Sequence, residues 1–248
     1  MNFMKREILI LIVLFLMIVT LNYSFLDSFL VKNFQNPNVG FVERVIDGDT
    51  AIINNHSVRF LGINSPELKE VGHDEAMNFL KNKIEGKNIT LVFGPTKTDL
   101  YGRWLAYVFL GSENVNLESI ENGYSNAYFP EGKDSFHDNF MSAWEGCLEK
   151  NINLCEKSDN TCLKLETWDT SGQKVVLKNV CPGKLNITGF SVKDEGRKRY
   201  VFGNKVLLPD EEVVLTPKDW NVTYVWTKTG DSIFIRDEKN KLIYFGNY

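Results

Sequence analysis

The sequence is poor in the residues that build zinc sites, and it has no excess of positive charge. Its three His residues are scattered and no Cys-x-x-Cys pair occurs among its four Cys residues, which argues against a zinc site. The formal net charge of −4 argues against a protein that binds nucleic acid through a broad basic face. With 248 residues, 43% of them hydrophobic, the chain can bury a sizeable core as one large or two modest domains.

The charge is distributed unevenly along the chain. Residues 40–157 carry 11 Lys and Arg against 18 Asp and Glu, whereas residues 158–248 carry 14 against 12. Any phosphate binding in the first of these segments must therefore come from a few placed cations rather than from bulk charge.

The N-terminus contains the one long apolar run. Lys5 and Arg6 precede it, and about 19 residues up to Asp27 follow with no charge, close to the ~20 that span a bilayer. No small-x-small cleavage site is evident, so a retained membrane anchor is favoured over a cleaved signal peptide or a buried helix. The two cations then place the N-terminus in the cytoplasm and the rest of the chain outside, or the chain is secreted if the segment is cleaved. We expect residues 1–39 to be this anchor or signal, followed by a short tether.

Four Cys residues suit an extracellular compartment. Three connectivities are possible, and proximity in the sequence favours Cys147 with Cys155 and Cys162 with Cys181. Four buried free thiols in a cytosolic protein are the alternative, which conflicts with the anchor.

Two further segments follow the tether. In residues 40–157 the pattern predicts strands over 41–46, 50–53, 57–63, 87–93 and 103–110, and helices ending near 84, over 116–122, and from 134 or 135 onward. In residues 158–248 it predicts only short strands, at 162–168, 174–180, 188–194, 200–202, 206–208, 212–216, 232–236 and 242–245. Their regular spacing is typical of a small β-sandwich.

Oxygen-bearing side chains are expected to meet in the first segment. Asp49 begins a strand and Asn64 follows the next one, and a meander brings such positions together. Their side-chain oxygens, with a backbone carbonyl and waters, suit Ca²⁺, and Glu67 can reach the same pocket. By itself the Asp-Gly-Asp at 47–49 is usually only a hairpin turn.

Two arginines are candidates for phosphate binding. Arg59 lies within a strand that otherwise faces the core, and Arg103 follows a turn. Taken singly, each is more often a structural ion-pair partner. Converging on a pocket with carboxylates and a metal, they are the groups that phosphodiester hydrolysis requires.

These motifs occur together in one known family. Four blocks resemble the staphylococcal nuclease (thermonuclease) family in content, order and spacing, over residues 41 to about 157: Val45-Ile-Asp-Gly-Asp-Thr50, Arg59-Phe-Leu-Gly-Ile-Asn-Ser-Pro-Glu67, Thr98-Asp-Leu-Tyr-Gly-Arg-Trp-Leu-Ala-Tyr107 and Val115-Asn-Leu-Glu-Ser-Ile-Glu-Asn-Gly123. The resemblance implies a mainly β fold with some α, a five-stranded OB-type barrel with three helices. It also implies Ca²⁺-dependent hydrolysis of DNA and RNA.

The resemblance assigns a role to each candidate residue. Asp49 and the backbone carbonyl of Ser65 would bind the metal together with Asn64, and Asp47 would stand behind these ligands. Glu67 would be the general base or orient the attacking water, while Arg59 and Arg103 would hold the phosphate. The pocket for the nucleotide would be lined by Tyr101 and by a second aromatic residue, at Tyr128 or Phe129.

Two positions depart from the family pattern. Asn64 replaces a metal-binding carboxylate, which should weaken metal affinity, and Leu100 replaces a Lys that contacts phosphate. With the acidic segment, these changes predict weak binding to long duplex DNA and a preference for short or single strands. They also motivate the alternative, a catalytically inactive nucleic-acid-binding surface module.

Residues 158–248 resemble a lamin-tail domain, an immunoglobulin-like sandwich often appended to surface nucleases. The resemblance rests mostly on strands and turns, at 185–194, 200–202, 208–212 and 230–237. A solvated surface is the favoured role of its basic residues, and contact with nucleic acid or envelope polymers is the alternative; they are Lys164, Lys174, Lys184, Arg197, Lys198 and Arg199. The partner of this domain is not predicted.

Overall fold

The computed structural model describes residues 38–248, and Gly40–Tyr248 form one compact unit. The expected anchor and most of the tether therefore lie outside the described residues. Within those residues, no helix has both the length and the apolar character needed to cross a membrane.

Five strands close into a barrel, as predicted. β1 (Val39–Asp47), β2 (Thr50–Ile53), β3 (His56–Phe60), β5 (Asn88–Thr98) and β6 (Trp104–Leu110) follow the order β3-β2-β1-β5-β6, and β3 also pairs with β6 in parallel. That last pairing removes the open edges of the sheet. Side chains that alternate along these strands fill the interior, among them Val42, Ala51, Val58, Leu91 and Val108.

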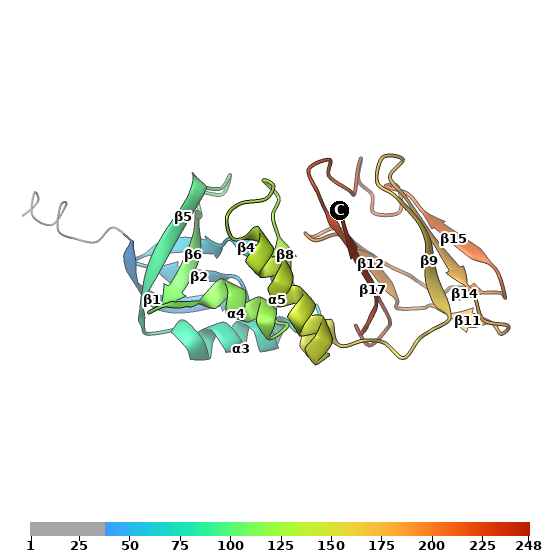
Figure 1. Cartoon of the computed structure of the whole chain (residues 1–248), viewed down its shortest axis with the longest axis horizontal. Coiled ribbons are helices and arrows are strands. Elements are labelled where there is room, and N and C mark those ends of the chain that lie inside the picture. The colour runs from blue at the N-terminus through green and yellow to red at the C-terminus, as the bar shows by residue number, and fades with distance from the viewer. Residues whose placement is uncertain (1–37) are drawn as a thin grey trace, which may run out of the picture. The chain divides into compact units, whose positions relative to one another are not determined.

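Three helices accompany the barrel: α3 (His73–Ile84), α4 (Val115–Glu121) and α5 (His137–Lys150). α3 and α4 lie along one side of the barrel strands (Figure 1). α4 begins where the Asn114 side chain accepts hydrogen bonds from the backbone N–H groups of Asn116 and Leu117. α5 begins a little later than predicted, because the Asp134 carboxylate instead accepts hydrogen bonds from the Tyr107 hydroxyl and the Phe136 N–H.

The strand predicted over 57–63 is broken. Gly62 has a φ of 75°, and a Cβ there would lie 2.7 Å from the Phe140 ring, so only glycine fits this position. After the break the chain forms β4 (Gly62–Asn64), which leaves the barrel sheet and pairs with β8 (Asn126–Tyr128). In this pairing Asn64 lies opposite Asn126. The one further barrel strand is the short β7 (Glu113–Asn114), paired with β6.

The C-terminal segment is a β-sandwich, and the predicted strands there are confirmed. One sheet has the order β15-β10-β9, the other β13-β12-β16-β17, with a small β11-β14 pair beside them. Apolar side chains of both sheets share one core, for example Val175, Leu177 and Leu215 with Val192 and Ile233. The bounds are β9 (Leu163–Asp169), β10 (Lys174–Asn179), β11 (Leu185–Asn186), β12 (Ser191–Lys193), β13 (Arg199–Val201), β14 (Val206–Leu207), β15 (Glu212–Leu215), β16 (Ser232–Arg236) and β17 (Leu242–Asn247).

Disulfides and aromatic packing connect these elements. Both predicted disulfides are confirmed: Cys147–Cys155 at the end of α5 and Cys162–Cys181 beside β9. Trp144 of α5 packs edge-on against Phe234 and Phe245 of the sandwich, with ring centroids 5.6 Å apart in both pairs. The barrel and the sandwich therefore contact each other through buried rings as well as through the polar residues described below.

Candidate active site

The turn between β1 and β2 brings Asp49 to Ser65. A Cβ at Gly48 would lie 2.6 Å from the Cβ atoms of both Ser65 and Ala76, so the turn approaches these residues as closely as only glycine permits. The Asp49 Oδ2 accepts a hydrogen bond from the Ser65 N–H at 3.0 Å. Asp47 stands behind it, with its Oδ1 accepting from the Asp49 N–H at 3.0 Å. The predicted neighbourhood of these three residues is therefore present.

Arg59 is buried and paired. Its side chain projects from β3, its Nη2 lies 3.0 Å from the Asp49 Oδ2, and the residue is only 7% exposed. The same Nη2 donates a longer hydrogen bond, 3.4 Å, to the Asn64 Oδ1. Because a buried guanidinium requires partners, Asp49 holds Arg59 in place and both contribute to one polar cluster.

Arg103 is positioned by the turn that precedes it. The Asp99 Oδ1 accepts hydrogen bonds from the N–H groups of Tyr101 and Arg103, and its Oδ2 accepts from the Arg103 Nε at 2.7 Å. Burial opposes the charge of Asp99, but these bonds outweigh it and hold the pKa of Asp99 below its usual value. The Nε is thereby engaged, and the rest of the guanidinium is left to meet a ligand. It also lies 5.6 Å from the centre of the Tyr101 ring.

A cavity of about 530 Å³ joins the two arginines. Arg59 and Arg103 line it together with Asn64, Tyr101 and Tyr128, all of which the sequence had nominated. Phe129, the other candidate for the second aromatic residue, lines it as well. Burial raises the pKa of Tyr128, so its hydroxyl keeps its proton and remains a hydrogen-bond donor. The cavity has the size and the mixed polar and aromatic lining of a ligand site.

The oxygen atoms gathered around Asp49 and Arg59 suit a hard divalent cation. Asp47, Asp49, Asn64 and the Ser65 carbonyl offer oxygen atoms only, the ligands that Ca²⁺ prefers. Burial, and then the charge of Asp49, raise the pKa of Asp47, and a cation would relieve this repulsion between carboxylates. Among residues 38–248, no group of three or more His, Cys, Asp or Glu is placed to hold a metal ion. A cation here would need neutral oxygens among its ligands.

Glu67 does not itself line the cavity, but it has an unexpected partner that does. Its Oε1 is 2.6 Å from the Nε of Arg197, a residue of the sandwich that also lines the cavity. The Asn64 Nδ2 donates hydrogen bonds to backbone carbonyls of the same sandwich loop, at Gly196 (2.9 Å) and Glu195 (3.3 Å). Arg197 is exposed, as expected of a surface residue, but its ion pair with Glu67 of the barrel was not predicted. No motif in the sequence could have indicated this contact, because 130 positions separate the two residues.

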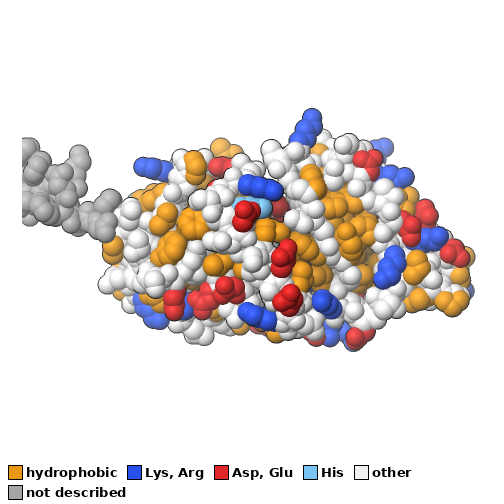
Figure 2. All heavy atoms as spheres, viewed as in Figure 1, with side chains coloured by type: hydrophobic (Ala, Val, Ile, Leu, Met, Phe, Trp, Pro, Cys, Tyr) orange, Lys and Arg blue, Asp and Glu red, His pale blue; other side chains and the backbone are white. Residues whose placement is uncertain are grey.

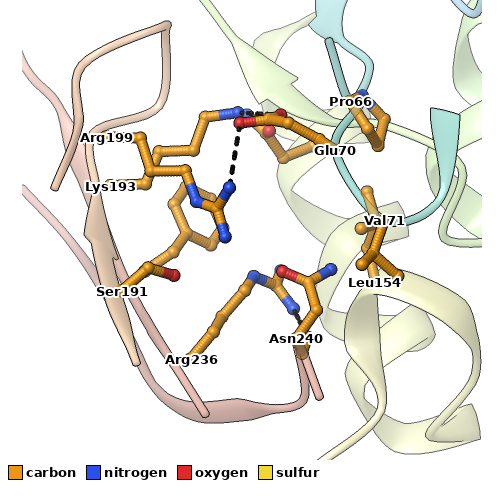
Figure 3. A pocket seen from close by; sticks show the side chains of 11 residues that line it. Pro66, Glu70, Val71, Leu154, Ser191, Lys193, Arg199, Arg236 and Asn240 are labelled. Atoms are coloured by element: carbon orange, nitrogen blue, oxygen red, sulfur yellow. Dashed lines mark hydrogen bonds and ion pairs between the residues drawn. The ribbon is translucent and has the colours of Figure 1, made fainter. Parts of the chain in front are cut away.

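A second set of contacts holds the β12–β13 hairpin, which contains Gly196 and Arg197, against the barrel. Figure 3 shows Lys193 and Arg199 reaching Glu70 from the sandwich, with nitrogen–oxygen distances of 3.2 and 3.6 Å. Burial opposes the charge of Glu70, but Lys193 outweighs it and lowers the pKa of this carboxyl. Arg236 lies beside them, and burial, followed by the charge of Arg199, lowers its pKa to about 10. These contacts, too, were not predicted.

Basic side chains do not form one patch on the face of the molecule drawn in Figure 2. On the face drawn in Figure 2, the Lys and Arg side chains of the described residues are scattered among Asp and Glu rather than gathered into one patch. A phosphate-bearing ligand would therefore be held by the few arginines of the cavity, as the sequence implied.

The structure is a closed barrel with a cavity that two arginines line. With oxygen donors beside Arg59, this cavity suits an anionic ligand. The family profile described as "Staphylococcal nuclease homologue" matches residues 57–154, which include both arginines and Glu67 but not Asp47 and Asp49. The thermonuclease of Staphylococcus intermedius is 32% identical over 126 residues, which cover 47% of this chain and 75% of the relative. This chain belongs to the staphylococcal nuclease family.

Other relatives agree. The thermonuclease of Staphylococcus hyicus is 31% identical over 123 residues, covering 45% of this chain and 73% of the relative. Endonuclease YhcR of Bacillus subtilis (strain 168) is 32% identical over 124 residues, covering 42% of this chain but only 10% of that much longer protein. In each case the matched share is less than half of this chain.

Proposed function

We propose that this protein is a nuclease that hydrolyses phosphodiester bonds of DNA or RNA with the help of Ca²⁺. The observation that carries the proposal is the convergence of Arg59 and Arg103 on one cavity, with Tyr101 and Tyr128 also lining it. Glu67 is ion-paired with Arg197, a further residue of that lining. The family's curated relatives, named thermonucleases and endonucleases, support the same reaction class.

The arginines would bind and stabilise the phosphate. Asp49 holds Arg59 from one side, and Asp99 holds Arg103 through its Nε. Each guanidinium is thus oriented before substrate arrives, and a fork of N–H donors matches the oxygens of a phosphate whose charge grows during attack by water. Tyr101, which is 82% exposed, offers a ring face to a nucleotide base or sugar at the mouth of the cavity.

Glu67 would orient the attacking water and accept its proton. Its carboxylate is half exposed, so water reaches it, and it is paired with the exposed Arg197 rather than with a buried cation. An exposed ion pair is weak and exchanges readily with solvent, so the carboxylate is available for proton transfer.

The cation would be held by Asp49, the Asn64 side-chain oxygen and the Ser65 carbonyl, with Asp47 behind them. When bound, Ca²⁺ would supply positive charge to the phosphate and make a nearby water more acidic. With Asn64 in place of a carboxylate, the site carries less negative charge, so we expect binding to require higher Ca²⁺ concentrations.

The test is cleavage by the purified full-length chain of labelled single-stranded DNA, duplex DNA and RNA, in millimolar Ca²⁺ and in EGTA. We expect cleavage only with Ca²⁺, and best on single strands. Glu67→Gln should reduce the rate at least about 100-fold, whereas Glu149→Gln, an exposed glutamate on α5, should leave it unchanged. Intact substrate in every Ca²⁺ reaction would refute the proposal.

An inactive nucleic-acid-binding module is the second candidate. It is favoured by the engagement of Glu67 with Arg197 and of the Asn64 amide with the sandwich loop. A Ca²⁺ titration followed by Trp fluorescence, together with fluorescence anisotropy of a labelled single strand, separates the two. Binding of the strand without a Ca²⁺ response or cleavage would favour the module.

The location of the protein is a further part of the proposal. The charge and length of the N-terminal run, together with the two disulfides, support a chain anchored in the cell membrane with residues 40–248 outside. The sandwich would be a lamin-tail-like domain. Membrane fractionation and N-terminal sequencing of the mature protein test the anchor against a cleaved signal.

A further inference from the structure

The hairpin formed by β12 and β13 lies against the cavity of the barrel. Its turn, residues 194–198, is bound at its backbone by two barrel amides. The Asn64 Nδ2 donates to the Gly196 carbonyl at 2.9 Å, and the Asn126 Nδ2 donates to the Glu195 carbonyl at 2.9 Å. Asn64 and Asn126 are the paired residues of β4 and β8, so one rung of that small sheet holds the turn.

The stem of the hairpin is held by the same stretch of barrel that carries Glu67. Lys193 and Arg199 are partners across the β12–β13 pairing, and both reach the Glu70 carboxylate (Figure 3). Glu70 in turn accepts a hydrogen bond from the backbone N–H of Glu67 at 3.0 Å. The position of the hairpin is therefore coupled to the position of Glu67.

Arg197 projects from this fixed turn and remains free to reorient. It is adjacent to Gly196 and its side chain is 59% exposed. Among residues 38–248, its one ion pair is the contact with Glu67. The same side chain lines the cavity shared by Arg59 and Arg103. An ion pair this exposed adds little stability, typically below about 1 kcal/mol, so fixing the fold is a poor account of it.

We propose that Arg197 is a substrate-binding residue of this nuclease site, which contacts a backbone phosphate of a single nucleic-acid strand and is supplied by the second domain. The proposal rests on the nuclease function proposed above. When the strand enters, the Arg197 guanidinium exchanges the Glu67 carboxylate for a phosphate, which it binds through a fork of N–H donors. Glu67 is thereby released for its water. On a barrel segment with 18 acidic and 11 basic residues, each added cation in the cavity matters.

The experiment measures binding and cleavage separately. A fluorescein-labelled single-stranded oligonucleotide is titrated with the full-length chain in EGTA, where no cleavage is expected, at several salt concentrations. The variants are Arg197→Ala, Arg197→Lys and, as the matched control, Arg44→Ala, an exposed arginine of β1 outside the cavity. KM and kcat are then measured in Ca²⁺.

Arg197→Ala should raise Kd and KM about tenfold, because a charge-assisted hydrogen bond to phosphate is lost. It should also reduce the slope of log Kd against log salt concentration by about 0.7, the value for one phosphate contact on a single strand. Arg197→Lys should keep the slope and lose part of the affinity, since it keeps the charge but not the fork. Arg44→Ala should change neither.

An unchanged slope and Kd in Arg197→Ala would overturn the proposal, because a merely structural residue would leave both unaltered. Tighter binding or faster cleavage by that variant would also overturn it and would make Arg197 a blocking residue over Glu67. A third outcome is that neither the wild type nor any variant cleaves, yet Arg197→Ala still lowers the slope of log Kd against log salt concentration. The proposed nuclease function then fails, while the binding role of Arg197 stands.

Discussion

The barrel and the sandwich both bury charged side chains, but in different arrangements. In the barrel, Asp49 and Arg59 are buried as an ion pair at the wall of a cavity. In the sandwich, Asp194 and Asp231 are buried near one another and near Glu195, with Lys198 as the cation beside Asp194. The barrel thus buries opposite charges beside a cavity, whereas the sandwich buries like charges in and beside the turn of the hairpin that reaches the cavity.

The largest effects should come from the barrel pair. Arg59→Ala and Arg103→Ala should each slow cleavage roughly 100- to 1,000-fold, since each removes a donor to the developing phosphate charge. Their stabilities should differ: Arg59→Ala leaves Asp49 buried without its cation and should lower the free energy of unfolding by about 3–5 kcal/mol. Arg103→Ala breaks a partly exposed pair and should lower it by about 1 kcal/mol or less.

Urea unfolding and single-turnover cleavage of the two variants test this difference. Arg44→Ala, which removes an exposed arginine from β1, is the control for the loss of charge. Equal free energies of unfolding for Arg59→Ala and Arg103→Ala would show that the buried Asp49–Arg59 pair is no more important to the fold than the partly exposed Asp99–Arg103 pair.

The next effect concerns pH and the acids of the sandwich. Burial, then the charge of Asp231, raise the pKa of Glu195 to about 8, and the same causes raise the pKa of Asp194 to about 6. Between the ordinary carboxyl pKa and these values the folded state binds more protons than the unfolded state. The free energy of unfolding should therefore fall as pH rises from about 5 to 8, by on the order of a few kcal/mol.

Glu195→Gln should flatten this fall, because a neutral amide replaces the carboxyl that loses its proton. Urea unfolding at pH 5, 6, 7 and 8, followed by the fluorescence of the buried Trp226, provides the measurement. Glu70 should have the opposite effect on the pH dependence, because its pKa is lowered in the folded state. Its contribution to the free energy of unfolding is lost only as pH falls through the acid range. A wild type with a flat profile from pH 5 to 8 would contradict the burial of these acids.

Asn64 is one of the barrel residues that contact the sandwich. Its substitution should have an effect of intermediate size on both Ca²⁺ response and stability. Asn64→Asp should lower the Ca²⁺ concentration for half-maximal cleavage about tenfold, since a carboxylate adds charge to the cation site. It should also lower stability by about 1–3 kcal/mol, because the new carboxylate faces the carbonyls of Glu195 and Gly196 and can no longer donate to them.

Asn64→Ala is the control for that variant, because it loses the same hydrogen bonds without adding charge. It should lose stability and show no gain in Ca²⁺ response. If Asn64→Asp requires as much Ca²⁺ as the wild type, then the cation does not bind at Asn64.

The smallest effect is expected from the rest of the sandwich surface. The triple variant Lys164→Ala, Lys174→Ala, Lys184→Ala removes three exposed cations that lie away from the cavity. Cleavage and its salt dependence should stay within about twofold of the wild type, because distant exposed charges are screened. A large drop would mean that the sandwich binds nucleic acid over a broad face and not through Arg197 alone.

Local patterns in the sequence were enough to predict most of the secondary structure. Alternating apolar residues identified the barrel strands and nearly all the sandwich strands, and helical spacing identified α3, α4 and α5. The patterns missed short elements such as β8 and β11, because two or three residues carry too little periodicity. They also merged β3 with β4, because Gly62 breaks the strand through a contact with Phe140, far along the chain.

The candidate site divides in the same way. Asp49, Arg59, Asn64 and Arg103 were identified from the sequence because the meander and turn that position them are local, with the resemblance to a nuclease family supplying their roles. The disulfides followed from proximity for the same reason. For Arg197 a solvated surface was favoured over contact with nucleic acid, since neither composition nor spacing relates it to Glu67.

Patterns in the sequence predicted the barrel and the sandwich strands, favoured the cysteine pairs that the structure contains, and named several residues of the cavity, because each of these depends on contacts between near neighbours or on side-chain alternation. Only the tertiary structure decided that the sandwich places a hairpin against the cavity, that Asn64 donates its amide to that hairpin, and that Glu67 pairs with Arg197. Contacts between the barrel and the sandwich depend on how their complementary surfaces pack, and no local pattern in either segment encodes that packing.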